Sequence, residues 1–318
     1  MTNPAIIDEA HGDAWSLFNG DSCDILPTLP DNSVDFSCFS PPFLSVYTYS
    51  PTERDLGNCK GPAQFFEHFS FITKELVRLI KPGRIMAVHV ANLPLYQTRD
   101  GVAGLYDFRG DCIRHFQEHG FVYHAEATIQ KNPQAQAIRT KARGLLFVQL
   151  KRDASWMRQA TADYIVAMRA PGDNAVPVKP DISQEEWIRW AHPVWSDVDT
   201  VEDAEAEAAL WEPFVSSWQG IRETDVLQVH GARENDDEKH LCPLQLSAIE
   251  RCVRLWTNPG EVVLSPFAGI GSEGYQSLLC GRKFVGSELK PSYFKVAASN
   301  LRAAEAKLAA PTLLGATD

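Results

Sequence analysis

Short apolar strands alternate with amphipathic helices along most of this chain, and the alternation limits the folds that it can adopt. The runs "VDFSCF" at 34–39 and "RIMAVHV" at 84–90 are apolar at almost every position, which is typical of strands buried on both faces. Residues 62–80 have helical spacing, and we expect that helix to stop at Lys81-Pro82-Gly83. The same alternation returns after residue 241. The sequence therefore predicts a doubly wound, mostly parallel α/β sheet with a helical insertion.

The composition fits a globular chain from a reducing compartment. With 318 residues, 44% of them hydrophobic, the chain can bury a sizeable core as one large domain. No apolar run approaches the roughly 18 residues of a membrane helix, and the first residues lack a signal-peptide pattern. The seven cysteines include no C-x-x-C pair, and the nine histidines show no H-x-x-x-H spacing. We therefore expect a cytoplasmic protein with no disulfide framework and no metal site.

Between residues 172 and 236 the alternation of strands and helices breaks down. Five of the eight tryptophans fall in this stretch, together with many acids and prolines. Residues 183–186 and 200–203 have the Ser/Thr-x-x-acid pattern of helix starts. We therefore expect a small helical insertion with an aromatic core of its own. It would separate two halves of one catalytic domain, 1–171 and 237–318.

Charge is unevenly distributed in this chain, whose formal net charge is −11. Residues 181–213 carry ten acids against one arginine, a net of −9. Residues 131–158 carry seven bases against one aspartate, a net of +6. A basic stretch inside an acidic chain can meet nucleic-acid phosphates, or it can be a solvated surface. We interpret it as a nucleic-acid surface, with these candidate contacts: Arg139, Lys141, Arg143, Lys151 and Arg152.

The strand at 34–39 runs directly into Ser40-Pro41-Pro42-Phe43. Prolines lack an N–H donor and fix φ, so neither a strand nor a helix continues easily through them. The segment is either a plain turn or a rigid support that holds Ser40 and Phe43 toward a ligand. We favour the rigid support because the C-terminal part of the chain carries a matching motif.

That second motif is a strand at 261–265 that runs into a glycine-containing turn and then a helix. In "SPFAGIG", Gly269 and Gly271 let the backbone approach a ligand, and the helix start offers free N–H groups. The next strand ends at Glu288, 19 residues after Gly269, where a carboxylate can accept from both hydroxyls of a ribose. The spacing predicts a nucleoside-cofactor site. A tight turn with a surface glutamate is the alternative.

Together the two motifs resemble those of the amino-methyltransferases of DNA, which use S-adenosylmethionine. The catalytic motif of that family is Asp, Asn or Ser, then Pro-Pro and an aromatic residue, and "SPPF" matches it. Its cofactor motif is usually Asp-Pro-Phe-x-Gly-x-Gly, and "SPFAGIG" matches it except at Ser265. The catalytic motif comes first, which resembles the order of the β class. The resemblance covers 13–171 and 236–308 and implies a Rossmann-like methyltransferase sheet, with 172–236 as a target-recognition insertion.

The resemblance also implies roles for the motif residues. The Ser40 hydroxyl and the Pro41 carbonyl would accept hydrogen bonds from the target amine, while Pro42 stiffens the segment and Phe43 stacks on a flipped base. The implied cofactor contacts are Asp21, Ser265, Pro266, Phe267, Ala268, Gly269, Gly271, Ser272 and Glu288. Asp21 is equally well explained as a turn residue. Residues 241–245 depart from the family pattern, so we expect the methionine end of the cofactor to be held differently.

The sequence leaves the target base and the partners open. Ser-Pro-Pro variants resemble the N4-cytosine enzymes, so we favour cytosine N4, with adenine N6 as the alternative. More remote alternatives are an enzyme acting on RNA or a protein amide, an inactive DNA-binding relative, and a nicotinamide oxidoreductase. The implied partner is double-stranded DNA. A homodimer and a cognate restriction nuclease, as in restriction-modification systems, are compatible with the family.

Overall fold

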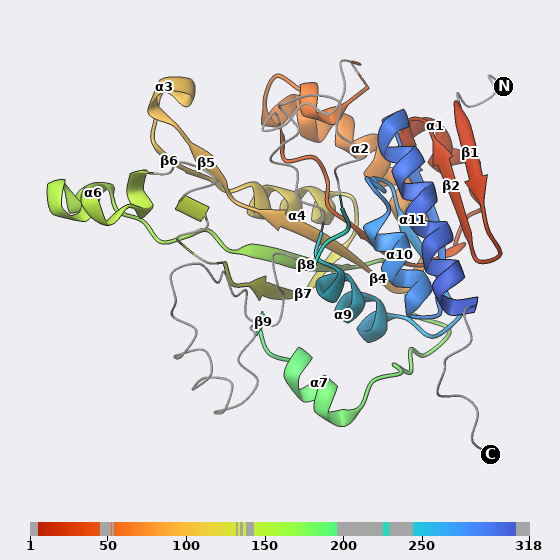
Figure 1. Ribbon diagram of the computed structural model, residues 1–318. Coiled ribbons are helices and arrows are strands. Elements are labelled where there is room, and N and C mark those ends of the chain that lie inside the picture. Colours follow the sequence, from red (N-terminus) through yellow and green to blue (C-terminus); the bar gives the residue numbers. More distant parts are fainter. Residues whose placement is uncertain are drawn as a thin grey trace.

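One large sheet forms the centre of the molecule. The computed structural model describes residues 6–44, 52, 54–131, 133, 136–137, 143–195, 225–228 and 244–309. In these residues nine strands pair in the order β1-β2-β11-β10-β3-β4-β8-β7-β9 (Figure 1). The strands are β1 (Asp8–His11), β2 (Trp15–Asn19), β3 (Val34–Phe39), β4 (Ile80–Ala91), β7 (Val122–Ile129), β8 (Asp163–Arg169), β9 (Val194–Trp195), β10 (Val262–Ser265) and β11 (Lys283–Glu288).

The five central strands β2, β11, β10, β3 and β4 are parallel to one another. On one side, β8 is antiparallel to both β4 and β7. On the other side, β1 returns as a hairpin with β2. This arrangement confirms the predicted doubly wound, mostly parallel sheet, because the parallel strands are joined through helices on both faces.

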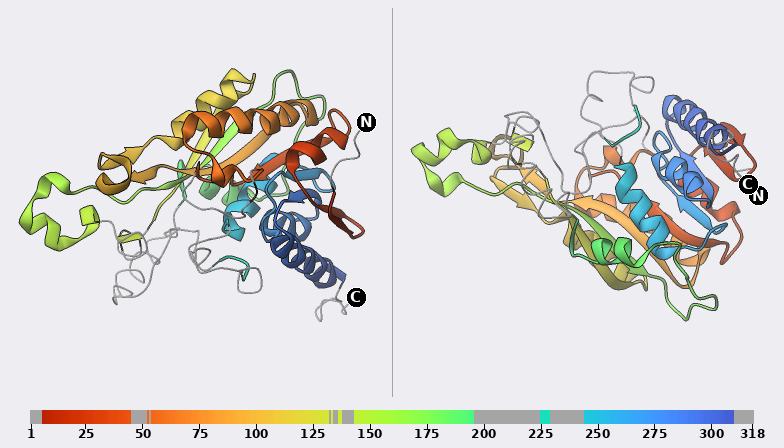
Figure 2. Two further views of the ribbon diagram at one scale, coloured as in Figure 1. Left: turned by 90° about the horizontal axis from the view of Figure 1, so that it is seen from above. Right: turned by 60° about the horizontal axis from the view of Figure 1, so that its bottom comes forward.

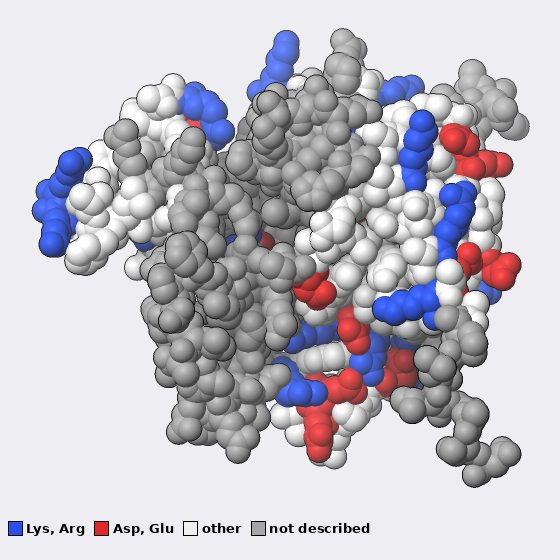
Figure 3. All heavy atoms as spheres, in the orientation of Figure 1, with Lys and Arg blue, Asp and Glu red and all other residues white. Residues whose placement is uncertain are grey.

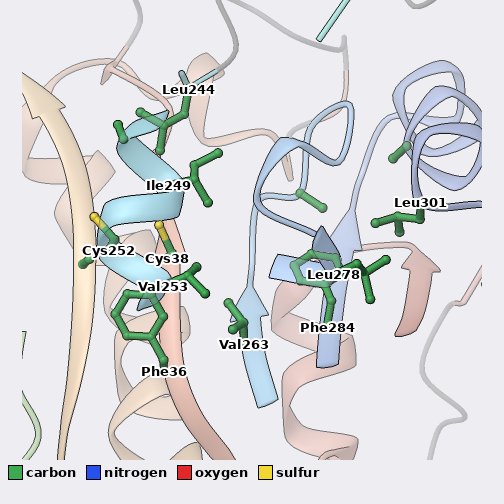
Figure 4. Close-up of a cluster of buried hydrophobic side chains, with 14 of the residues drawn as sticks. Phe36, Cys38, Leu244, Ile249, Cys252, Val253, Val263, Leu278, Phe284 and Leu301 are labelled. Atoms are coloured by element: carbon green, nitrogen blue, oxygen red, sulfur yellow. The ribbon is translucent and has the colours of Figure 1, made fainter. Parts of the chain in front are cut away.

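Helices cover both faces of the sheet (Figures 1 and 2). The helices on one face are α2 (Pro62–Leu79) and α4 (Phe108–Glu118), and those on the other are α9 (Leu246–Trp256), α10 (Ser272–Leu279) and α11 (Pro291–Ala309). Each set buries its apolar side chains against the strands in a separate core. In the second core, Phe36 and Val263 of the sheet lie beside Val253 of α9, and Phe284 faces Leu278 and Leu301 (Figure 4). The two cores hold β3 and β10 between helices, which fixes the strand ends that carry the motifs.

The start of β4 differs from the expectation for Lys81-Pro82-Gly83. The helix before it ends at Leu79, and the strand begins at once at Ile80, so the three residues lie inside β4. Gly83 has a φ of 71°, and the pairing of β3 with β4 shifts register between Val34 and Phe36. A bulge accommodates the proline and glycine there, which local turn rules do not reveal.

Two segments project from the carboxyl edge of the sheet, beyond the end of β4. One is the hairpin of β5 (Leu93–Leu95) and β6 (Gly104–Tyr106), with α3 (Gln97–Asp100) at its tip. The other is the connection from β7 to β8, which carries α6 (Phe147–Arg152). Figures 1 and 2 show α6 as the most distant described element on that side. We call the described residues 143–158 of this connection the arm.

The described start of the insertion runs along the opposite, amino edge. Lys179 N donates to Asn258 Oδ1 at 2.7 Å, just ahead of β10. Helix α7 (Gln184–Trp190) then begins with a capping box between Ser183 and Glu186, as its sequence pattern predicted. Trp195 of β9 is buried in the sheet core instead of in an aromatic core of the insertion. Residues 196–224 lie outside the described part of the chain.

Candidate functional site

The two motifs meet at the point where the strand order reverses. β10 and β3 are parallel neighbours. From β10 the chain passes through α10 to β11 on one side, whereas from β3 it passes through α2 to β4 on the other. Ligands of open α/β sheets bind at such a point, beyond the carboxyl ends of the strands. The rings of Phe39 and Phe267 are 5.7 Å apart, so segments 40–43 and 265–272 leave the sheet side by side.

Glycines give the cofactor loop, 265–272, its backbone shape. Gly269 and Gly271 have φ values of 53° and 85°, in the left-handed region that other residues rarely adopt. A Cβ on Gly271 would lie 3.1 Å from Ala297, so this glycine also lets α11 pack closely. A Cβ on Gly269 would meet nothing within 4 Å. The loop is thus packed at Gly271 and open at Gly269, which suits the approach of a ligand to its backbone.

Glu288 stands against this loop at the end of β11, as the spacing predicted. Its Oε2 accepts from Gly269 N at 2.8 Å, and its Oε1 accepts from Lys290 N at 2.9 Å. Each carboxylate oxygen has a second lone pair, so the side chain can still accept from a ligand. Burial raises the pKa of Glu288 to about 7, although the two backbone N–H groups act in the opposite direction.

Serine hydroxyls and apolar contacts hold the first half of the loop. The Ser22 and Ser287 hydroxyls both donate to the Pro266 carbonyl, and Ala268 N donates to Ser287 O at 2.9 Å. The ring of Phe267 packs 6.1 Å from that of Phe69. These contacts place Pro266, Phe267 and Ala268 as supports of the loop.

Two further hydroxyls at the ends of the loop are available to a ligand. Ser265 and Ser272 are buried, and their Oγ atoms have no hydrogen-bond partner in the described part of the chain. Buried polar atoms are normally satisfied, so such atoms point to a missing partner. With the open side at Gly269 and the carboxylate of Glu288, they fit the nucleoside cofactor that the resemblance implies.

Two acids near the loop escaped the sequence reasoning. Glu273 lies in the first turn of α10 and is buried, and burial raises its pKa to about 8, with a further contribution from Glu288. Asp55, also buried, contributes to the raised pKa of Glu288. An acid directly after a glycine loop is a usable signal for Glu273. Nothing in the sequence indicates that Asp55 approaches the end of β11.

Asp21 lies beside Glu288 but is also explained by local structure. It caps the short helix α1 (Ser22–Ile25) by accepting from Cys23 N at 2.9 Å. Its Oδ2 accepts from Arg54 Nη1 at 3.0 Å. Gly20 N donates to Glu288 O, which brings this turn next to the cofactor loop. The capping role of Asp21 is therefore present, and a contact with the cofactor stays a prediction.

The Ser-Pro-Pro-Phe segment is held on several sides. Ser40 Oγ lies 3.1 Å from His89 Nδ1 and 3.4 Å from His89 O. The half-buried Phe43 ring packs 5.8 Å from Phe108 and 6.0 Å from His89. Leu44 has a φ of 51°, and its N–H donates to Pro42 O at 3.1 Å. Strained backbone of this kind clusters at functional sites, and the contacts match a rigid support more closely than a plain turn.

Behind Ser40 lies a group of ionisable residues that the sequence reasoning missed. His89 Nε2 is 3.3 Å from Asp163 Oδ2, and Lys131 Nζ forms an ion pair with the same oxygen. Burial alone would raise the pKa of Asp163, but Lys131 and His89 outweigh it and lower the pKa to about 2. His89 lies two residues before the end of β4 and Asp163 begins β8, at the same edge of the sheet. Polar residues at that edge were the available signal.

The arm presents part of the predicted basic surface. Lys151 and Arg152 are exposed on α6, and Figure 3 shows basic side chains gathered at its far end. Phe147 on the same helix is 69% exposed. Other bases of the stretch have different surroundings, because Lys131 pairs with Asp163 and Arg158 is half-buried. Arg139, Lys141 and the side chain of Arg143 lie outside the described residues.

Two described acids of the 181–213 segment, Asp181 and Glu186, are paired at the amino edge. Asp181 accepts from Arg282 at 2.7 and 2.8 Å, and Glu186 pairs with Arg254 at 2.8 Å. Their pKa values are lowered, that of Asp181 by the Arg282 hydrogen bond and that of Glu186 by the Ser183 backbone and then by Arg254. These two acids therefore lie on the opposite side of the sheet from the motifs.

Metal-binding and membrane-spanning features do not occur in the described residues. No group of three or more His, Cys, Asp or Glu side chains there could hold a metal ion. Within the same ranges, no helix is long and apolar enough to cross a membrane. The described cysteines are all free thiols: Cys23, Cys38, Cys59, Cys112, Cys252 and Cys280.

Solved structures share the fold of this chain along most of its length. A protein from Thermus thermophilus, described as a putative DNA modification methylase and solved with S-adenosyl-L-methionine, superposes with a TM-score of 0.62 at 20% identity. The match covers 91% of this chain and 93% of that one. The PvuII DNA methyltransferase, described as cytosine-N4-specific, gives a TM-score of 0.57 at 17% identity over 91% of this chain and 86% of that one.

Sequence comparison extends the match to the family. The Type II methyltransferase M.BglI of Bacillus subtilis is 19% identical over 342 residues, covering 90% of this chain and 85% of that protein. The family model described as DNA methylase, N6_N4_Mtase, matches residues 34–299. Because that match spans well over half of the sequence, the chain belongs to the DNA methylase family N6_N4_Mtase.

Proposed function

We propose that this protein transfers a methyl group from S-adenosylmethionine to the exocyclic N4 amine of a flipped cytosine in DNA. One observation carries the proposal: Ser40 and the cofactor loop leave adjacent parallel strands at the switch point of the sheet. A target amine at Ser40 would lie next to a cofactor held at the loop. Adenine N6 is the alternative target, since its amine presents a similar edge.

Residues 265–272 and Glu288 would bind the cofactor. When bound, S-adenosylmethionine supplies an activated methyl group on a sulfonium. The open backbone at Gly269 and the hydroxyls of Ser265 and Ser272 would contact it. Glu288 would accept from the ribose hydroxyls with the lone pairs that Gly269 N and Lys290 N leave free. Ser265 would supply a hydroxyl where the family usually has a carboxylate.

The Ser-Pro-Pro-Phe segment would bind the target amine. An exocyclic amine is a poor nucleophile because its lone pair is delocalised into the ring. Two acceptors, Ser40 Oγ and the Pro41 carbonyl, would bind its N–H groups and favour the pyramidal nitrogen of the transition state. No residue in the described ranges donates to the Pro41 carbonyl. The prolines and the contacts of Phe43 keep this geometry fixed, so little reorganisation is needed.

Phe43 would also receive the flipped base. Its ring is only partly buried, with His89 and Phe108 packed against it. Base–aromatic stacking contributes about 1–3 kcal/mol by alanine substitution. We therefore expect Phe43→Ala to weaken methylation at low DNA concentration while cofactor affinity stays nearly unchanged.

DNA would be bound on the carboxyl side of the sheet. The arm projects there with Lys151 and Arg152 exposed, and Arg139, Lys141 and Arg143 belong to the same basic stretch. The paired acids at Asp181 and Glu186 lie at the other edge, where they would not repel phosphates. We propose residues 172–236 as the target-recognition insertion between the halves 1–171 and 237–318.

The choice of cytosine rests on Ser40. A hydroxyl in place of the carboxylate resembles the N4-cytosine enzymes. M.BglI, a Type II methyltransferase, supports a place in a restriction-modification system with a cognate nuclease, and homodimers are compatible with it. An RNA target is the remote alternative.

The test is to express the chain in a host that lacks DNA methylation and to map modified bases by single-molecule sequencing. N4-methylcytosine at a fixed sequence is expected, and Ser40→Ala should reduce it strongly. N6-methyladenine would move the assignment to the alternative base. An unmodified genome, together with purified enzyme that methylates no DNA, would overturn the proposal.

A further inference from the structure

The role proposed for Ser40 depends on where its own hydroxyl proton points. A serine hydroxyl has one proton to donate and two lone pairs with which to accept. To accept from a target amine, Ser40 has to direct its proton away from the amine. Among the described residues, the acceptors within reach of it are His89 Nδ1 at 3.1 Å and His89 O at 3.4 Å. Which of these atoms accepts the hydrogen bond from the Ser40 hydroxyl depends on the tautomer of His89.

The surroundings of His89 select one tautomer. Its Nε2 is buried and has no hydrogen bond of regular geometry to a described residue, but it lies 3.3 Å from Asp163 Oδ2, the acceptor it faces. Asp163 is held in its ionised form by Lys131, so it can only accept. A histidine facing a carboxylate carries its proton on that side. His89 is then Nε2–H, and its Nδ1 is an acceptor.

The two tautomers give Ser40 different capacities. If Nδ1 is an acceptor, the Ser40 proton points at it and both lone pairs of Oγ remain for the substrate. If Nδ1 carries a proton, it donates to Ser40 Oγ and occupies one lone pair. The second state leaves a weaker acceptor for the amine, in a site where acceptor strength matters most in the transition state.

We propose that His89, fixed as its Nε2–H tautomer by Asp163, is a positioning residue. Its Nδ1 accepts a hydrogen bond from the Ser40 hydroxyl, which leaves both Oγ lone pairs directed toward the target amine. The inference rests on the proposed function. It adds three residues, His89, Asp163 and Lys131, to a site that the motif alone places on Ser40 and Pro41. Lys131 has a supporting part, since it keeps Asp163 charged in a buried position.

The first test reads the tautomer directly and needs no turnover. Full-length protein labelled with ¹⁵N-histidine contains nine histidines, and the signals of His89 are assigned by their loss in His89→Asn. Long-range ¹H–¹⁵N spectra should show His89 as Nε2–H. Asp163→Asn has a similar shape but can donate, and should shift His89 toward Nδ1–H. A wild-type His89 that carries its proton on Nδ1 would overturn the proposal.

The second test asks whether His89 acts through Ser40. We expect His89→Gln to slow single-turnover methyl transfer about 10- to 100-fold, because it has no acceptor at the Nδ1 position. His89→Asn has an amide oxygen near that position and should recover much of the rate. Cofactor affinity should stay unchanged in both variants. Equal losses in Gln and Asn would contradict the proposal.

A double-mutant cycle separates positioning from a structural role. If His89 works through Ser40, then His89→Gln adds no further loss in a Ser40→Ala background, and the two changes are fully coupled. Additive losses would show that His89 acts independently. Rates in the Ser40→Ala background are measured at high enzyme concentration.

Failure of this inference is distinguishable from failure of the proposed function. If wild-type protein methylates DNA but the cycle is additive, the positioning role is wrong and the function stands. If no DNA is methylated, the function fails whatever tautomer the spectra show.

Discussion

Two glutamates at opposite edges of the sheet have pKa values shifted in opposite directions. At the amino edge, Glu261 accepts from Asn258 N at 2.7 Å and pairs with Arg84, whose side chain is 2% exposed. Burial opposes its ionisation, but Asn258 and Arg84 outweigh it, so the pKa of Glu261 is lowered. At the carboxyl edge, Glu273 is buried more deeply than the half-buried Glu261, and burial raises its pKa to about 8. Glu288 beside it has a pKa of about 7 for the same reason.

This difference in pKa shift distinguishes acids that stabilise the fold from acids that belong to the candidate site. Acids at the amino edge have cationic partners: Asp35 with Lys81, Asp181 with Arg282, and Glu261 with Arg84. The two acids at the cofactor loop instead interact with backbone N–H groups: Glu288 with those of Gly269 and Lys290, and Glu273 with its own at the start of α10. Their raised pKa values mean that ionising them near neutral pH lowers the stability of the folded protein. Perturbed acids of that kind concentrate where a ligand is bound.

The largest effect is expected at the amino edge. Glu261→Gln retains the size of the side chain but leaves Arg84 buried without its counter-charge, and breaking a buried pair in this way costs about 3–5 kcal/mol of unfolding free energy. Urea unfolding measures the loss. Arg114→Ala, which removes an exposed pair with Asp111, is the control and should leave the midpoint unchanged. Equal midpoints for the two variants would mean that Glu261 is not a structural charge.

A change at the carboxyl edge should affect ligand binding more than stability. Glu288→Ala removes the acceptor proposed for the ribose and should weaken cofactor binding by about 1–3 kcal/mol. Calorimetry with S-adenosylhomocysteine measures it, with Glu67→Ala on the exposed face of α2 as the control. Unchanged affinity in Glu288→Ala would remove this residue from the cofactor site.

The two edges should also respond oppositely to pH. A buried acid with a raised pKa binds its proton more tightly in the folded state, so stability is present at low pH and is lost as pH rises toward about 8 for Glu273. Each such proton contributes up to about 1.4 kcal/mol per pH unit. Glu273→Gln should therefore flatten the fall in unfolding free energy between pH 5 and pH 8.

Acids with lowered pKa values, such as Glu261, contribute stability that is lost as pH falls instead. The loss below pH 5 should therefore persist in Glu273→Gln. An unaltered slope between pH 5 and pH 8 in this variant would show that Glu273 is not buried as an acid.

The smallest effect is expected on the arm, where basic charge faces outward. If Lys151 and Arg152 contact phosphates, each should contribute about 0.9 to the slope of log K against log salt for duplex binding. The double change Lys151→Ala with Arg152→Ala should flatten that slope and weaken all sequences about equally. Lys283→Ala, an exposed base at the start of β11, is the matched control. Identical slopes in the double variant and the wild type would make the arm a solvated surface.

Sequence patterns correctly predicted those features whose structure is set by residues close together in the chain. The glycine loop, the acid at Glu288 and the capping box at 183–186 each occupy a short stretch, and each takes the predicted structure. The sheet type followed from the alternation of strands and helices. The family was recognised for the same reason, since its two motifs are continuous in sequence.

Contacts that depend on which strands pair, and in which register, could not be predicted from the sequence. His89 and Asp163 meet because β4 and β8 pair antiparallel, with Ala91 opposite Asp163, and no short-range signal fixes that pairing. The same limit applies to Trp195, which packs in the main core through its pairing with β7. Counting charges in the basic stretch could not show that Lys131 faces inward to Asp163.

The order of the strands has a consequence for how the molecule is assembled during synthesis. β2 and β3 are consecutive in the chain, yet β11 and β10 lie between them in the sheet. A nascent chain that ends before residue 262 therefore holds β2 and β3 with unpaired backbone edges, which are prone to aggregate. The late pair has to enter between strands already made, a long-range step that slows folding. The loop at 265–272 and Ser40 become neighbours only then, so the candidate site forms only after β10 and β11 have been synthesised.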